Sequence, residues 1–134
     1  MPWTFLDYVD ASGSNQIEAW LESLPKGART PVRAKFAAIL TIARAQRQLL
    51  PPRFCVLHGV ERMLEIKFIE GRVAYRPLAC YGPERGEVTL LAGATERNNQ
   101  YRPAGVLETA NRRRAEVLSD RRRVTATCLL KTGN

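Results

Sequence analysis

"MLEIKFIEGRVAYRPLACYGPERGEVTLLAGA", residues 63–94, is the stretch that decides the fold expected for this chain. Its first part, residues 63–69, has the apolar residues Leu64, Ile66 and Phe68 at every second position. Successive side chains of a β-strand point to opposite faces, so this alternation is typical of a strand with one buried face. The polar positions between them would lie on the other face.

Two further strands follow, separated by short turns. Residues 72–81 form the second strand, and Pro77 within it favours an edge position or a bulge, because proline cannot donate to a ladder. Residues 87–94 are apolar enough to form a central third strand. The turns "EG" and "GPERG" suit hairpins, so the sequence predicts an antiparallel meander.

The residues before the meander predict one strand and two helices. Residues 3–9 are aromatic and branched, as in a short strand. Asn15 is a candidate helix cap, with apolar residues following at helical spacing. The second helix has Thr30 as its cap and Pro31 at its first position, and it ends at Leu50 before two prolines. A short connection between the two helices predicts an antiparallel hairpin.

A last helix is expected to begin at Pro103, which completes an α+β domain over residues 1–118. The expected fold is a small antiparallel sheet of three or four strands with an N-terminal helical hairpin and a C-terminal helix. The helices would cover one face of the sheet and leave the other partly open. Residues 119–134 form a basic tail, either a short extra element or a disordered segment.

The composition narrows the class of protein. The 134 residues suit one domain. Three dispersed cysteines and a single histidine make a metal site improbable, and reduced cysteines are expected. No apolar run approaches the roughly 20 residues of a membrane span, and the N-terminus lacks the features of a secretory signal. We therefore expect a cytoplasmic protein with no membrane partner and no small-molecule cofactor.

The net charge of +8 and the pI near 10.0 favour an anionic partner, such as nucleic acid, a ribonucleoprotein or an acidic protein. Residues 1–60 carry 7 basic and 4 acidic side chains, and residues 112–134 carry 7 and 2. Residues 61–111 are balanced, with 7 of each. A basic group in this central part would therefore act locally.

Four stretches resemble, in order, motifs of the RelE/ParE toxin superfamily, in particular its HigB-like and phage-derived branch. They are "LHGVERMLEIKF", "VAYRPLACY", "EVTLLAGATER" and a proline followed by "VLETANRRRAEVL". The upstream "AWLESLPKGARTPVRAKFAAIL" is similar to the helical hairpin of that family. The resemblance extends over about residues 3–118 and implies a RelE-like fold.

The resemblance also implies a function. It predicts the toxin of a toxin–antitoxin system, bound by a cognate helix-turn-helix antitoxin. Relatives of the RelE and HigB type are endoribonucleases that cleave mRNA on the ribosome. The ribose 2′-OH attacks the adjacent phosphate, a reaction that needs a base, an acid and cations but no metal.

Candidate catalytic residues follow from the matched motifs. Lys67 matches the arginine of a Glu-Leu-Arg motif, Arg76 that of a Tyr-Arg motif, and Arg97 the second lysine of a Lys-Lys motif. We expect Arg76 and Arg97 to hold phosphate, because guanidinium binds it bidentately, and Lys67 to act as a second cation or in proton transfer. Tyr101 would stack on a base or transfer a proton. His58 is either an acid–base group or a structural residue of a turn. The arginines expected to bind RNA phosphates are Arg62, Arg72, Arg102 and Arg113.

The chain departs from the family pattern at one motif. Where relatives tend to have Phe-x-Lys-Lys, this chain has Ala94, Thr95, Glu96 and Arg97. Glu96 would repel RNA phosphates within the limits of screening. Three interpretations stay open: an active ribonuclease with a rearranged site, a toxin with another target such as gyrase, or a non-catalytic protein that binds nucleic acid or an acidic partner. The basic residues could also be an ordinary solvated sheet face.

Overall fold

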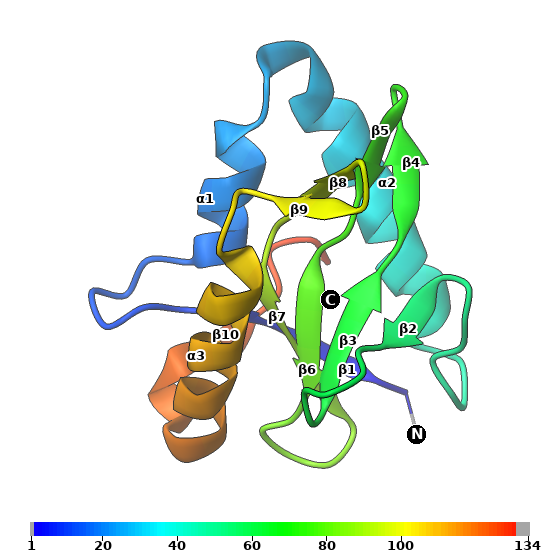
Figure 1. The fold of residues 1–134 in the computed structure, drawn as a ribbon. Helices are drawn as coiled ribbons and strands as arrows, with labels where there is room; N and C mark the ends of the chain where they lie inside the picture. Colours follow the sequence, from blue (N-terminus) through cyan, green and yellow to red (C-terminus); the bar gives the residue numbers. More distant parts are fainter. Residues whose placement is uncertain (1, 131–134) are drawn as a thin grey trace.

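A six-stranded sheet forms the centre of the fold, which a computed structural model describes for residues 2–130 (Figure 1). The strand order is β10-β1-β7-β6-β3-β2. β1 runs parallel to β7, and every other neighbouring pair is antiparallel. The bounds are β1 (Thr4–Tyr8), β2 (Phe54–Val56), β3 (Met63–Ile66), β6 (Leu78–Tyr81), β7 (Glu87–Ala92) and β10 (Val124–Ala126).

A second sheet consists of four short antiparallel strands in the order β4-β5-β8-β9. Its strands are β4 (Phe68–Glu70), β5 (Val73–Tyr75), β8 (Thr95–Arg97) and β9 (Gln100–Arg102). The β8–β9 hairpin turns at Asn98 and Asn99, whose φ angles are 54° and 62°. Two successive left-handed residues are typical of the type I′ turn, whose twist matches that of the flanking strands.

Helices cover both faces of the six-stranded sheet (Figure 1). α1 (Gln16–Ser23) and α2 (Lys26–Ala43) pack on one face, and α3 (Val106–Ser119) packs on the other. The expectation that all helices lie on one face is therefore wrong. Within residues 2–130, no helix combines the length and the apolar character that crossing a membrane requires.

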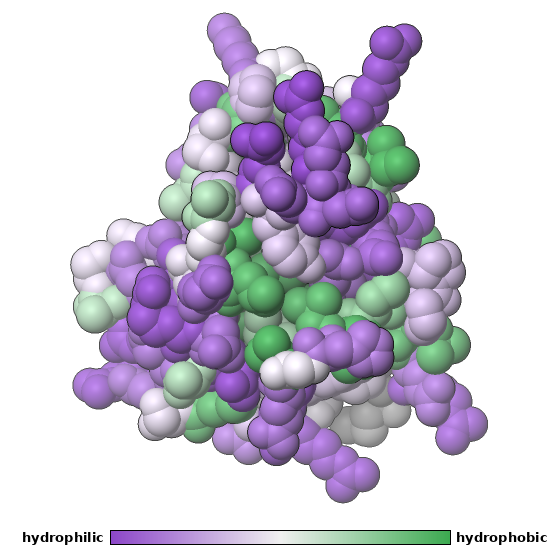
Figure 2. Space-filling view, viewed as in Figure 1, coloured by the Kyte–Doolittle hydropathy of each residue, from purple (hydrophilic) through white to green (hydrophobic). Residues whose placement is uncertain are grey.

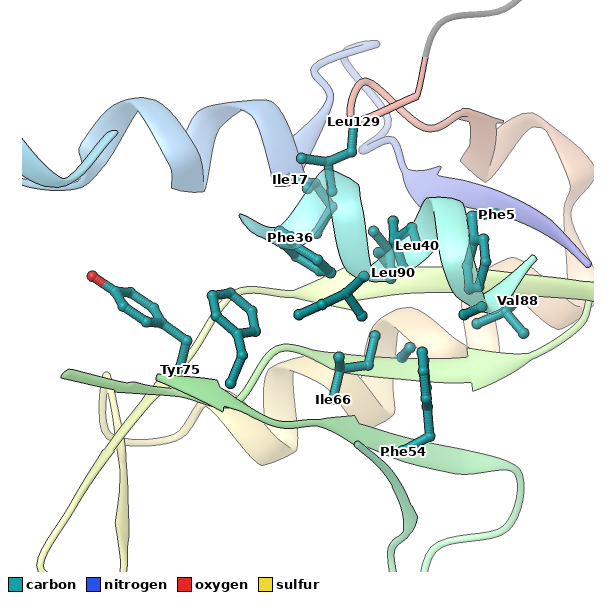
Figure 3. Close-up of a cluster of buried hydrophobic side chains, with 14 of the residues drawn as sticks. Phe5, Ile17, Phe36, Leu40, Phe54, Ile66, Tyr75, Val88, Leu90 and Leu129 are labelled. Carbon is teal, nitrogen blue, oxygen red and sulfur yellow. The ribbon is translucent and has the colours of Figure 1, made fainter. Parts of the chain in front are cut away.

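The larger core lies between the sheet and the α1–α2 pair (Figure 3). Phe36 and Leu40 of α2 meet Ile66, Val88 and Leu90 of the sheet, and all five side chains are fully buried. A second cluster joins α3 to the opposite face. The alternation predicted for residues 63–69 is confirmed, since Leu64, Ile66 and Phe68 all lie in the first cluster and Met63 in the second.

The predicted bounds of the second helix are wrong at both ends. α2 begins at Lys26 rather than at Pro31 with Thr30 as its cap, because the Pro25 carbonyl already accepts from the amide of Ala28 at 2.8 Å. It ends at Ala43 rather than Leu50. There the Arg44 carbonyl accepts from the Trp3 amide at 2.7 Å, a tertiary bond that local sequence does not reveal.

Several strands differ from the prediction. Over residues 2–130 the two sheets contain ten strands rather than three or four, and the α+β class is confirmed. Pro77 lies between β5 and β6, and β6 is a central strand rather than an edge strand. The alternative of a bulge agrees with the structure, since the β6–β7 register shifts between Leu78 and Ala79, directly after Pro77. Residues 95–102, predicted as a loop, form the β8–β9 hairpin, and α3 begins at Val106, three residues after Pro103. The tail contains β10, which pairs with β1, and Leu129 is buried in the larger core.

Candidate nucleic-acid site

Five polar side chains gather on the face of the sheet that carries α3, where the β8–β9 hairpin meets the end of β3. We call Glu65, Lys67, Arg76, Glu96 and Tyr101 the polar cluster. In Figure 1, β9 crosses in front of the main sheet at this point. Figure 2, in the same view, shows mostly hydrophilic side chains over β9 and α3, with a hydrophobic area below β9.

Strand geometry explains why these residues share a face. Glu65 lies on β3 and Lys67 directly after it, two positions apart, so both side chains point to the same side. Glu96 and Tyr101 are directly paired across the β8–β9 hairpin. Arg76 follows β5, which pairs with β8, and its amide donates to the Ala94 carbonyl at 2.8 Å. Three separate segments thus supply the cluster.

Glu65 connects two members of the cluster. The Tyr101 hydroxyl donates to Glu65 Oε2 at 2.5 Å, and Lys67 Nζ lies 3.7 Å from Glu65 Oε1. Burial raises the pKa of the Tyr101 phenol above its usual value, and the hydrogen bond to Glu65 raises it further. The phenol therefore stays protonated at neutral pH and donates its hydrogen bond to Glu65.

Arg76 forms an ion pair inside the cluster. Its Nη2 lies 3.2 Å from Glu96 Oε1, and its Nη1 donates to the Tyr75 carbonyl at 3.0 Å. The side chain of Arg76 is only 16% exposed and that of Glu96 27%, so water screens the pair only in part. A guanidinium has five N–H donors, and these two contacts leave others for a ligand.

The polar cluster borders two hollows in the surface. One, of about 220 Å³, is lined by Glu65, Glu96, Asn99 and Tyr101. The other, of about 410 Å³, is lined by Pro52, Arg53, Lys67, Phe68, Ile69 and Arg76. Arg53 holds the backbone here, since its Nη1 donates to the Lys67 carbonyl at 2.6 Å. The second hollow is lined by the two cations of the cluster and the first by its two carboxylates.

Arg97 and Arg102 lie on the same hairpin and point away from the cluster. Each is adjacent in sequence to a cluster residue, Glu96 or Tyr101, so it faces the other side of the hairpin. Both are exposed. The structure therefore does not bring Arg97 together with Arg76 on one face.

Three other candidate residues lie at turns away from the cluster. His58 and Arg62 precede β3, while Lys67 follows it. The strand of 4 residues between them spans roughly 13 Å. Arg72 is at the exposed turn between β4 and β5, with a φ of 70°. All three are exposed.

Arg113 is engaged within the fold. Its Nη1 donates to the Leu91 carbonyl at 2.8 Å, and its guanidinium carbon lies 4.9 Å from the centroid of the Tyr8 ring. Burial lowers the pKa of this guanidinium from its ordinary value. These contacts join α3 to β1 and β7 and account for the position of Arg113 without a ligand.

Glu65 is the functional candidate that the sequence reasoning missed. The sequence does contain a feature that points to Glu65: it stands two positions from Lys67 on a predicted strand, so both side chains share the polar face of that strand. Its contact with Tyr101 joins residues 36 positions apart and could not be read from local pattern. Within residues 2–130, no three His, Cys, Asp or Glu side chains are grouped so as to hold a metal ion.

Comparison with known proteins adds no relative: no protein-family model, curated protein or solved structure matches this chain.

Proposed function

We propose that this protein is the toxin of a toxin–antitoxin system and a ribosome-dependent mRNA endoribonuclease. The observation that carries the proposal is the polar cluster: two carboxylates, a protonated phenol and two cations on one face, beside two hollows in the surface. These are the groups that cleavage of RNA by its own 2′-OH requires.

Glu65 is the proposed base. Its carboxylate removes the proton of the ribose 2′-OH, the oxygen attacks the neighbouring phosphorus, and the bond from phosphorus to the 5′-oxygen breaks. The products are a 2′,3′-cyclic phosphate and a free 5′-hydroxyl. Glu65 accepts a hydrogen bond from Tyr101 and lies near Lys67, so its carboxylate is held in a fixed position.

Tyr101 is the proposed acid, and Lys67 and Arg76 stabilise the charged phosphorane. Tyr101 is protonated at neutral pH, and it would donate its proton to the departing 5′-oxygen, an alkoxide that is a stronger base than phenolate. Arg76 would donate N–H groups to the phosphate oxygens, and preorganised donors of this kind are a large term in catalysis. Glu96 positions the guanidinium before the phosphate arrives.

The test is induced expression in a bacterial host, with growth followed and mRNA 5′ ends mapped. We expect growth arrest and new 5′ ends within ribosome-bound messages. Arg76→Ala should relieve the arrest, and Tyr101→Phe should slow cleavage by roughly 10²- to 10⁴-fold, the usual contribution of a general acid. Coexpression of a cognate helix-turn-helix antitoxin should restore growth.

Arg85→Ala is the matched control, because Arg85 is exposed in the β6–β7 turn, away from the cluster. Its toxicity should equal that of the original chain. Full toxicity in a folded Arg76→Ala variant would show that Arg76 does not take part in the cleavage reaction. Circular dichroism of each purified variant separates loss of activity from loss of fold.

The Arg76–Glu96 pair also favours a second function, a binding protein without catalysis. A carboxylate 3.2 Å from the main phosphate-binding candidate weakens its attraction for RNA. Growth arrest without new mRNA ends would favour a non-nucleolytic target such as gyrase. Normal growth with intact mRNA, from a soluble folded protein, would favour the binding role.

A further inference from the structure

A groove of about 990 Å³ lies between the second half of α2, the segment that follows it and the start of β2. We call it the α2 groove. In Figure 1 these elements lie side by side at the edge of the molecule where β2 ends the sheet. It is lined by Lys35, Ala38, Ile39, Ile42, Ala43, Gln46, Arg47, Gln48, Leu50, Pro51, Pro52, Arg53 and Phe54.

The lining of the α2 groove includes two apolar side chains that are accessible to solvent, Ile42 and Leu50, and we call these two its floor. Ile42 is 66% exposed and Leu50 57%, although both are large aliphatic side chains. Single exposed apolar residues are ordinary, whereas apolar residues that are grouped in a hollow with a polar rim form a candidate interaction site. The groove residues of α2 recur three or four positions apart, from Lys35 to Ala43, so the groove runs along the helix.

The ionisable residues that line the α2 groove are all basic: Lys35, Arg47 and Arg53. Residues 24–60, which include the whole groove, contain seven Lys and Arg residues and no Asp or Glu. The Lys35 ammonium donates to the Ile69 carbonyl at 2.6 Å, and a neutral carbonyl leaves its charge uncompensated. The rim is therefore positively charged around an apolar floor.

We propose that the α2 groove binds an acidic amphipathic helix of a partner protein. The apolar stripe of such a helix would cover Ile42 and Leu50, and its carboxylates would meet the basic rim. A groove parallel to α2 suits a second helix, because side-chain ridges of one helix pack into the grooves of another. Nucleic acid would leave the floor uncovered, and the net charge of +8 disfavours a second copy of this chain.

The inference does not depend on the proposed ribonuclease activity, because no member of the polar cluster lines the α2 groove. The two regions are nevertheless adjacent. Arg53 and Pro52 line both the groove and the hollow that contains Lys67 and Arg76. The part of the groove at Pro52 and Arg53 therefore borders the hollow beside the polar cluster.

The test is selection from a displayed library of helical peptides of about 18 residues, roughly five turns. Each peptide has an apolar stripe at helical spacing and randomised charges elsewhere, and the full-length protein is the target. We expect the enriched peptides to be acidic. A synthetic copy should lose affinity at least about tenfold for Ile42→Ser/Leu50→Ser and for Arg47→Glu, measured by fluorescence anisotropy.

Two variants are matched controls. Val56→Ser removes an aliphatic side chain that is 63% exposed but does not line the groove. Arg85→Glu makes the same charge change at an exposed turn elsewhere. Both should bind the peptide as the original chain does.

Four results would overturn the proposal. The selection could enrich no peptide, or peptides without an acidic bias. The groove and control variants could bind a selected peptide equally well. Sedimentation could show a dimer of the free chain that Ile42→Ser/Leu50→Ser dissociates, which would make a second copy the occupant. Those substitutions could instead weaken binding of single-stranded RNA, which would make the groove part of a nucleic-acid surface.

Discussion

Glu96 determines what Arg76 can do. The resemblance to the toxin family implies a lysine in this part of the motif, whereas this chain has a carboxylate that pairs with the guanidinium of Arg76 at 3.2 Å. The pair orients Arg76 and at the same time competes with any phosphate for its N–H groups. The ion pair therefore holds the guanidinium of Arg76 in a fixed orientation, but it lowers the affinity of that guanidinium for phosphate.

Glu96→Gln separates these two effects. The amide has the shape of the carboxylate and keeps an oxygen that accepts from Arg76, but it lacks the charge that repels phosphate. We expect the affinity for a short single-stranded RNA to rise roughly two- to fivefold, in keeping with the modest strength of a partly exposed pair. Fluorescence anisotropy measures the change. Glu84→Gln controls for the change in net charge, because the side chain of Glu84 is 68% exposed. If both variants raised the affinity equally, the ion pair between Arg76 and Glu96 would have no effect of its own on RNA binding.

The packing of α1 depends on one glycine of the adjacent strand. Gly93 lies directly after β7, and a Cβ built there would lie 1.7 Å from Cδ2 of the Trp20 ring. The Trp20 ring in turn makes edge contacts with Phe36 and Tyr75. The absence of a side chain at residue 93 thus lets α1 approach the sheet next to the segment that leads into β8.

Gly93→Ala should displace α1. Overpacking of a filled core costs about 1–3 kcal/mol, and the closeness of the indole ring favours the upper end of that range. Urea denaturation of the purified variant measures the free energy of unfolding. Gly27→Ala is the control, because a Cβ at this helical position has nothing within 4 Å and should stabilise α2 by about 0.5–1 kcal/mol. Equal stability of the two variants would contradict the packing argument.

The buried carboxylate of Asp7 connects the segment that follows β10 to the first strand. Asp7 on β1 is 0% exposed, and its Oδ2 accepts from Asn15 Nδ2 at 2.9 Å and from the Cys128 amide at 2.8 Å. Its Oδ1 is buried with no hydrogen-bond partner among the described residues. Asp7 therefore links the first strand, the cap of α1 and the chain beyond β10. Burial raises its pKa above the ordinary value.

This raised pKa makes stability depend on pH. Between the unfolded value of about 3.9 and the folded value, the folded state binds more protons than the unfolded state, so the free energy of unfolding falls as pH rises. Asp7→Asn removes this dependence, and its stability relative to the original chain should increase from pH 4 towards neutrality. Urea denaturation across that range measures it.

Asp10→Asn should show the opposite trend, which makes it a suitable control. Hydrogen bonds from Ser12 and Ser14 lower the pKa of Asp10, so its carboxylate contributes stability above the unfolded pKa and loses it as pH falls. The free energy of unfolding of Asp10→Asn, relative to that of the original chain, should therefore fall as pH rises. Parallel pH profiles for the two variants would contradict the assignment of Asp7 as the group with the raised pKa.

Local chemistry in the sequence accounts for part of this architecture. The alternation around Ile66 identified the buried face of β3, and the Asn15 cap of α1 was read correctly, since its side chain accepts from two amides of the first turn. The central position of β7 followed from its apolar run. The β8–β9 hairpin was missed because Asn98 and Asn99, which tolerate left-handed φ angles, stood in a stretch too polar to suggest strands.

The tertiary structure alone decided which elements meet. Periodicity tells which side of an element is apolar, but it does not identify the partner that covers that side. The parallel pairing of β1 with β7, the addition of β10 and the position of α3 on the second face follow from contacts far apart in the chain. The candidate site depends on the same kind of contact: Tyr101 with Glu65, and Arg76 with Glu96. The sequence by itself determined the residue types available for the chemistry, whereas long-range strand pairing decided which of them lie together.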